Sequence, residues 1–270
     1  MRATANMGRP RRLRIHWFDI FTAGVFLFLF APLFIIILFS FNESARLSFP
    51  ITGFSLRWYV EVLNSSVFRS AVKNTLIVGT ATSVTAVIVG TLASLGLTRY
   101  HSRLTQMLSS LMVIPISLPA LFLGIALLAY FALLQTRLSL FTVVIGHLIY
   151  TLPYFVLVAT ARLEGFDIVL EEAARDLGAT AWQTFWRVTF PIIAPSIIGA
   201  GILVFALSFD EFLITFFVIG SQSTLPMVIW SMMRRTIDPR INAISTMLVI
   251  ASLLFILIMN RFVKVTEISL

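Results

Sequence analysis

Long apolar segments separated by short polar ones dominate the sequence. A membrane-spanning helix needs about 20 predominantly apolar residues, and six segments reach that length. They cover residues 17 to 41, 70 to 97, 105 to 134, 139 to 161, 191 to 219 and 241 to 263. The pattern predicts an all-α integral membrane protein with six transmembrane helices, which together form a membrane domain over residues 17 to 263. Residues 1 to 16 and 264 to 270 are the predicted tails.

Composition supports a membrane protein and narrows its chemistry. The chain is 59% hydrophobic and 12% charged, whereas soluble domains are about half apolar and a quarter charged. It has no cysteine, which excludes disulfides, and its three histidines (His16, His101 and His147) show no metal-ligand spacing. We therefore expect no metal site and no cofactor bound by this chain.

The basic residues predict the orientation in the membrane. The net charge is +8, and the densest run of arginines, at residues 9 to 14, directly precedes the first apolar segment. That placement is typical of a topology signal and argues against a nucleic-acid site. Of the two short loops between predicted spans, one has Arg99 and Arg103 and the other has only Arg137. The loop with more bases is expected on the cytoplasmic side. With an even number of spans, both termini are expected in the cytoplasm.

Two shorter segments are amphipathic. Residues 55 to 63 place apolar side chains on one helical face next to Trp58, which predicts a helix in the membrane interface. Residues 221 to 240 are mixed in character and too short to span, so we expect a helix that lies on or dips into the outer leaflet.

The polar loop at residues 162 to 190 is rich in acids. Because anionic lipid attracts bases, an acidic loop is expected to face a protein partner. Beyond Arg162 it carries five acids against two bases: Glu164, Asp167, Glu171, Glu172 and Asp176, against Arg175 and Arg187.

Within this loop the sequence predicts two helices joined by a tight turn. Apolar residues at spacings of three and four from Leu163 to Leu177 indicate one amphipathic helix. Gly178 suits a left-handed C-terminal cap, and Thr180 with Gln183 forms a capping box. The second helix carries large aromatic side chains, so we expect this segment either to fold back on the bundle or to dock on another protein. The next helix is expected to start at Pro191. A hairpin that only caps the bundle is the simpler alternative.

The loop resembles the EAA loop of ABC importer permeases. That pattern reads Glu-Ala-Ala, three residues, Gly, nine residues, Ile, one residue, Leu-Pro. Here it is matched by residues 172 to 174, Gly178, Val188 and Pro191, with Val188 in place of Ile and Phe190 in place of Leu. Four further segments resemble the second permease of spermidine/putrescine-type importers: Ser208–Phe212, Thr224–Pro226, Asn242–Ala243 and Leu56–Tyr59. This resemblance covers roughly residues 50 to 265.

The resemblance implies a type I importer in the bacterial cytoplasmic (inner) membrane. Its partners would be a second permease, two ATP-binding subunits that hold ATP and Mg, and an extracytoplasmic substrate-binding protein. In this family the EAA loop is a coupling helix that sits in a cleft on the ATPase. The implied coupling residues are Glu172, Ala173, Ala174, Asp176 and Gly178.

Two acids interrupt the predicted fifth helix. Asp210 and Glu211 would each cost about 2.5–3.5 kcal/mol at a helix centre on insertion scales, so they should face the interior or a cavity. Either they attract a cationic substrate, or they pair with Arg234, Arg235 or the partner permease. In the first case we expect the substrate path or gate to include Phe209, Asp210, Glu211 and Trp230.

The substrate class rests on the resemblance. Polyamine-carrying members typically have an acid after the proline of the third helix, whereas here Ala120 follows Pro119. The expected cargo is therefore a polyamine or a related small amino compound, such as an opine or aminophosphonate.

The sequence indicates a transporter subunit and no enzyme. It contains no G-x-x-x-x-G-K-[ST] loop, so ATP hydrolysis would come from a partner, and Asp210 and Glu211 have no evident catalytic companion. The alternative is an autonomous proton-coupled carrier, a class that normally shows internal repeats and several buried acids. Neither feature is clear in this sequence.

Overall fold

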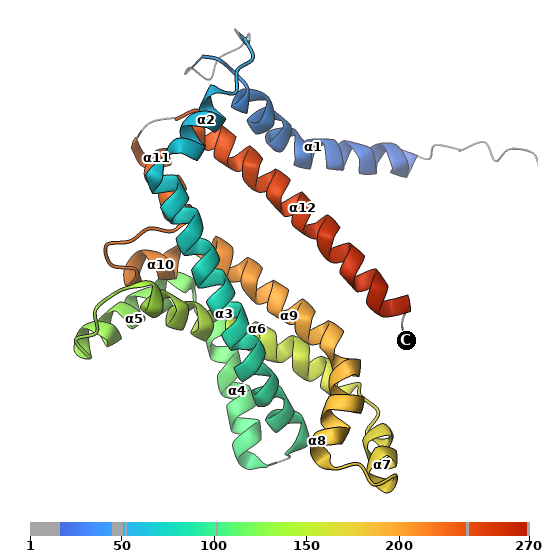
Figure 1. Cartoon of the computed structure of the whole chain (residues 1–270). Coiled ribbons are helices and arrows are strands. Elements are labelled where there is room, and N and C mark those ends of the chain that lie inside the picture. Colours follow the sequence, from blue (N-terminus) through green and yellow to red (C-terminus); the bar gives the residue numbers. More distant parts are fainter. Residues whose placement is uncertain (1–16, 45–50, 52, 101, 236–237, 269–270) are drawn as a thin grey trace, which may run out of the picture.

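The computed structural model describes residues 17–44, 51, 53–100, 102–235 and 238–268. In the described residues the regular secondary structure is helical, apart from one isolated bridge between Asn42 and Phe54, and turns and loops connect the helices. Thirteen helical elements follow in order (Figure 1): α1 (Trp17–Ser40), α2 (Arg57–Asn64), α3 (Ser66–Arg99), α4 (Arg103–Ser117), α5 (Ala120–Leu133), α6 (Leu140–Glu164), α7 (Val169–Asp176), α8 (Ala181–Thr184), the π-helix η1 (Phe185–Thr189), α9 (Phe190–Asp210), α10 (Leu213–Val218), α11 (Leu225–Arg235) and α12 (Arg240–Ile268).

The centre of the molecule is a bundle of α3, α6 and α9 (Figure 1). Small residues let these helices approach closely, as is usual in membranes. A side chain at Gly90 of α3 would collide with the ring of Phe155 on α6, and one at Gly201 of α9 would lie 2.8 Å from Val87. Phe155 is fully buried in the resulting apolar core.

A second apolar core joins α5, α6 and α10. The short helix α10 packs on α5 and α6. Its buried side chains Ile214 and Val218 contact Leu127 of α5 and Val143 of α6 within one cluster. This core holds in place α10, the segment that follows the end of α9.

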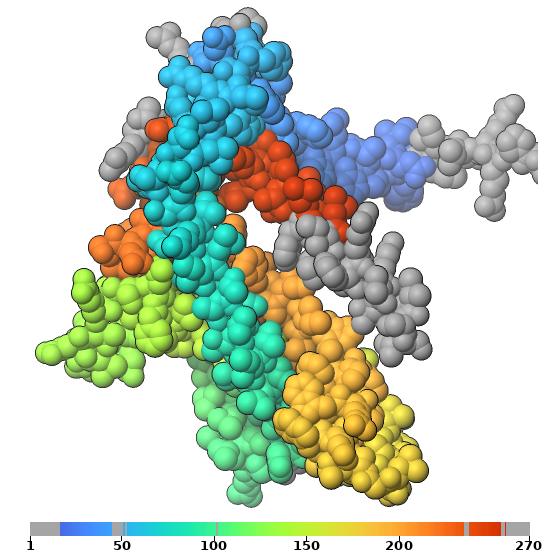
Figure 2. Space-filling model, viewed as in Figure 1, coloured from blue at the N-terminus to red at the C-terminus, as the bar shows by residue number. Residues whose placement is uncertain are grey.

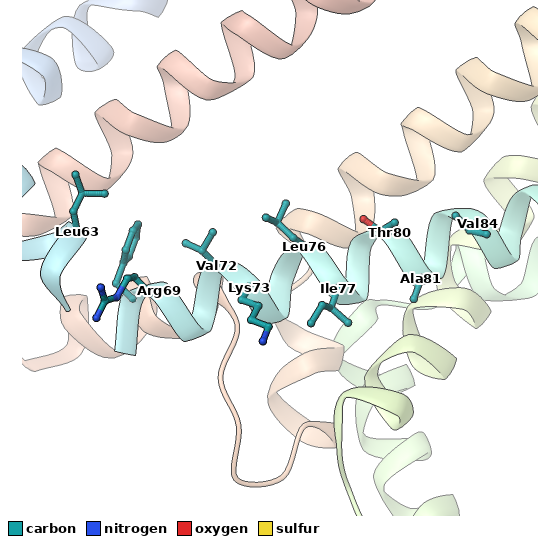
Figure 3. A pocket seen from close by; sticks show the side chains of 10 residues that line it. Leu63, Arg69, Val72, Lys73, Leu76, Ile77, Thr80, Ala81 and Val84 are labelled. Carbon is teal, nitrogen blue, oxygen red and sulfur yellow. The ribbon is translucent and has the colours of Figure 1, made fainter. Parts of the chain in front are cut away.

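The outer helices present apolar surface. In α1, no residue of the most apolar stretch is buried, and α1 and α12 diverge from the central bundle (Figures 1 and 2). An open groove of about 850 Å³ also runs along α3, lined mostly by apolar side chains with Arg69 and Lys73 near its α2 end (Figure 3). In a membrane, such faces are covered by lipid or by another subunit.

The third predicted span is bent. The sequence predicted one helix over residues 105 to 134, but the chain bends by 107° between α4 and α5. Leu118 is extended (ψ 130°) and Pro119 takes the N-cap position of α5. The predicted span placed Pro119 inside a helix, whereas the structure places it at the break. The residue before a proline avoids helical geometry, and the proline donates no N–H, so the chain turns here.

The fifth predicted span is broken as well. The sequence predicted one helix over residues 191 to 219, but α9 ends at Asp210 and α10 begins at Leu213. Glu211 is extended (ψ 112°), and its carboxylate accepts a 3.0 Å hydrogen bond from the N–H of Ile214. A side chain that caps the next helix in this way favours a break in the preceding one.

The predicted count of six spans stays a prediction. Among the described residues, four helices are long and apolar enough to cross a membrane, and the bent α4–α5 pair makes a fifth if it counts as one span. Helix α12 covers the predicted last segment, and α2 and α11 confirm the two short helices predicted in the loops. The predicted N-terminal tail, with His16, and His101 lie outside the described residues.

Candidate functional site: the α7 loop and the broken span

The turn between α7 and α8 has the predicted local geometry. Gly178 has φ +86°, a left-handed conformation that glycine adopts without steric penalty. Its N–H donates to the carbonyl of Arg175 at 2.9 Å, which ends α7. Thr180 and Gln183 form the reciprocal capping box that begins α8. The prediction of a tight glycine turn followed by a capped helix is confirmed.

The helix before this turn differs from the prediction. The sequence predicted one amphipathic helix from Leu163 to Leu177, but α6 runs to Glu164 and α7 starts only at Val169. Leu163 is buried, whereas Leu177 is 90% exposed. The apolar stripe therefore does not continue through the loop, because the bend around Gly165 turns α7 relative to α6.

One acid of the loop points inward. Glu171 is only 8% exposed, and its Oε1 accepts hydrogen bonds from Arg99 Nη2 at 2.5 Å and from Thr189 Oγ1 at 2.6 Å. Its second oxygen lies 3.9 Å from Arg175 Nη2. A buried carboxylate needs such partners. Glu171 thus ties α7 to the end of α3 and to η1.

Sequence reasoning missed this role of Glu171, which it grouped with the partner-facing acids. The available signal was Arg99, a base at the end of an apolar segment that had no assigned partner. The Arg99 guanidinium also lies 5.7 Å from the ring centre of Phe166, so the base has contacts on both sides.

Four of the five predicted coupling residues lie on the exposed side of the loop. Ala174 is half-buried, and the other four are exposed: Glu172, Ala173, Asp176 and Gly178. Among the described residues no ion pair involves Glu172 or Asp176. Beside these carboxylates, Leu177 is 90% and Trp182 is 71% exposed. Free carboxylates around large exposed apolar groups suit a protein partner.

The segment after the turn runs without interruption into the membrane core. The prediction placed a helix start at Pro191, but residues 181–210 form one continuous helical run. The π-helix η1 ends at Thr189, two residues before the proline. A local widening of this kind accommodates a residue that lacks the N–H of a regular turn. The second loop helix and the membrane helix therefore belong to one continuous helical run.

The broken span borders a small cavity. Its volume is about 270 Å³, and α9, α11 and α12 line it with mostly apolar side chains. Phe209, Asp210 and Trp230, three of the four predicted path residues, line it together with Phe212, whose ring centre lies 5.2 Å from that of Trp230.

The two acids of the break have different surroundings. Asp210 is exposed at the cavity, whereas the carboxylate of Glu211 caps α10. In the described part of the chain neither acid forms an ion pair. The predicted pairing with Arg234 is therefore absent, and the side chain of Arg235 lies outside the described residues.

Comparison with known proteins places these features in one family. The family model "Binding-protein-dependent transport system inner membrane component" matches residues 86–267. The spermidine/putrescine transport system permease protein PotC of Escherichia coli (strain K12) is 30% identical over 238 residues, covering 88% of this chain and 90% of that protein. The putrescine transport system permease protein PotI of the same strain is 34% identical over 231 residues, covering 83% and 82%.

Solved structures agree with this relationship at the level of fold. A chain of a bacterial ABC transporter involved in the import of the acidic polysaccharide alginate has a TM-score of 0.71 at 17% identity, covering 91% of this chain and 96% of that one. A chain of the MetNI methionine ABC transporter has a TM-score of 0.62 at 18% identity, covering 74% and 95%. The sequence match, supported by the fold, shows that this chain belongs to the family of inner membrane components of binding-protein-dependent transport systems.

Proposed function

We propose that this chain is a permease subunit of an ATP-driven importer for polyamines or a related small amino compound. Family membership supports the permease role, and the names of the two Escherichia coli relatives support the substrate class. The importer would contain a second permease, two ATPase subunits that bind ATP and Mg, and a substrate-binding protein outside the membrane. Both termini and the α7 loop would face the cytoplasm.

The observation that carries the coupling role is the two-sided α7 helix. Its outward side offers Glu172, Asp176 and Leu177 to a partner, and its inward side is fixed to α3 and η1 through Glu171. A push on the outward side would move α3 through the ion pair and α9 through the continuous helical run that begins at α8. Closure of an ATPase pair needs a rigid element of this kind to act on.

The cavity at the broken span supports a path for a cationic substrate. Asp210 contributes a carboxylate, and Phe209, Phe212 and Trp230 contribute aromatic rings. A carboxylate beside aromatic faces attracts alkylammonium groups by charge and by cation–π interaction. Ala120 supplies no acid, so Asp210 carries this role in our proposal.

A transport assay with charge reversal tests the coupling surface. In the importer assembled in proteoliposomes, Glu172→Lys should abolish ATP-driven uptake of putrescine and weaken binding of the ATPase, because the outward carboxylate becomes a base. Glu164→Lys is the matched control, since Glu164 is an exposed acid at the end of α6, and it should keep most of the uptake. Normal uptake by Glu172→Lys would refute the coupling assignment.

Purification from the native membrane separates the proposal from the alternative carrier. Mild detergent should recover the chain together with an ATPase and a second permease. Recovery of the chain alone, with uptake in liposomes that contain no ATP, would identify an autonomous carrier.

A further inference from the structure

A buried histidine bonds to both sides of the broken span. His147 lies on α6 and is 1% exposed. Its Nδ1 lies 2.7 Å from Ser208 Oγ on α9, and its Nε2 lies 2.7 Å from Thr215 Oγ1 on α10. The break at Glu211 falls between these two hydroxyls, so one imidazole bridges the helix before the break and the helix after it.

The neighbouring bonds fix the direction of this bridge. Thr215 Oγ1 donates its single proton to the carbonyl of Glu211 at 2.9 Å, so it accepts from the N–H at Nε2 of His147. A neutral imidazole has one donor and one acceptor, and Nδ1 therefore accepts from the hydroxyl of Ser208. Each of these buried polar groups has a partner, and a fully bonded network of this kind favours one arrangement of the helices.

Close packing holds α10 at the same place. A Cβ at Gly146, next to His147 in α6, would lie 2.7 Å from Ile214 Cγ2, and one at Gly124 in α5 would lie 3.3 Å from the backbone Cα of Ile214. Helix α10 has six residues, too few to be stable by itself. Its position depends on these neighbours and on the bond from His147.

We propose that His147 is a positioning residue that fixes the broken span and so holds Asp210 at the cavity between α9 and α11. Asp210 ends α9 only two residues after Ser208, and Thr215 anchors the chain five residues later. With both anchors bonded to one imidazole, the backbone around Asp210 has one position. The role of Asp210 rests on the proposed function, whereas the bridge rests on the geometry alone.

A distance measurement across the break tests this bridge. The chain has no cysteine, so Ile198→Cys on α9 and Leu213→Cys on α10, both at exposed positions, can carry spin labels in the assembled importer. With His147 present we expect one narrow distance distribution by electron paramagnetic resonance. His147→Leu should broaden or shift it and raise the KM for putrescine uptake several-fold. His147→Gln, which keeps a donor and an acceptor, should restore both.

Two further variants keep the test decisive. Thr151→Val is the matched control, because the buried Thr151 hydroxyl, among the described residues, bonds only to the carbonyl of His147 in its own helix. This variant should leave the distance unchanged. Thr215→Val is nearly isosteric, removes one end of the bridge and should act like His147→Leu even if that variant fails to insert. A parent-like distance in Thr215→Val would overturn the proposal. The distance needs no substrate, so it is read separately from uptake, which tests the proposed function.

Discussion

At the scale of single residues, the position of α7 depends on Glu171. Arg99 and Thr189 come from α3 and η1, and both bond to the same carboxylate oxygen. Glu171→Gln keeps the shape but removes the charge, which leaves the partly buried Arg99 without its anion at a cost of about 1–3 kcal/mol. We expect uptake to fall roughly tenfold, equivalent to about 1.4 kcal/mol, while ATP hydrolysis by the assembled importer persists. The number of ATP molecules hydrolysed per substrate imported measures this.

The control for this prediction is an acid of the same loop without the inward bond. Glu164→Gln changes an exposed carboxylate at the end of α6 and should leave the ATP-to-substrate ratio unchanged. Exchange of the two charges, with Arg99→Glu and Glu171→Arg combined, should recover part of the uptake lost in either single variant. An unchanged ratio in Glu171→Gln would show that this ion pair transmits nothing.

At the scale of elements, the turn between α7 and α8 depends on the backbone of Gly178. A Cβ there would meet no atom within 4 Å, so replacement strains only the left-handed backbone (φ +86°), at a cost of about 1–2 kcal/mol. Gly178→Ala should therefore increase cleavage of the loop in limited proteolysis. Gly199→Ala in α9 also meets no atom within 4 Å and has no positive φ, so it should stabilise the helix by about 0.5–1 kcal/mol. Equal cleavage of both variants would contradict this account.

The elements also show how far the sequence predicts the fold. The Gly178 turn and the Thr180 capping box were predictable because a few adjacent residues determine them. The breaks at Leu118 and Glu211 were not, because apolar length measures composition and does not report where the backbone leaves the helix. The inward side of α7 was hidden for another reason: only the tertiary contact with Arg99 shows which face of the helix is buried.

The candidate substrate path was also predicted only in part, because some of its features depend on contacts between residues that are distant in the chain. The sequence predicted that acids in the fifth span face either the interior or a cavity, and Asp210 lines a cavity. It grouped Glu211 with Asp210, but local capping of α10 uses that carboxylate. It treated His147 only as a residue without metal-ligand spacing, since its partners Ser208 and Thr215 are more than sixty positions away in the chain.

At the scale of the whole molecule, α2 and the α7 loop lie at opposite ends of α3. This helix has 34 residues, so its ends are about 50 Å apart. Its first residue follows α2, and its last residue, Arg99, bonds to Glu171 of α7. The proposed topology therefore puts α2 on the extracytoplasmic side of the membrane and the α7 loop in the cytoplasm, with the broken span between them (Figure 1).

Single cysteines test this orientation without background, because the chain has none of its own. Asn64→Cys at the exposed end of α2 should react with a membrane-impermeant maleimide in right-side-out vesicles, and Leu177→Cys beside the α7 turn should not. In inside-out vesicles the pattern should reverse, and removal of the ATPase should increase labelling of Leu177→Cys because its side chain is then uncovered. Labelling of Leu177→Cys from outside would place the loop on the wrong side for an ATPase. It would refute the coupling role while leaving the fold intact.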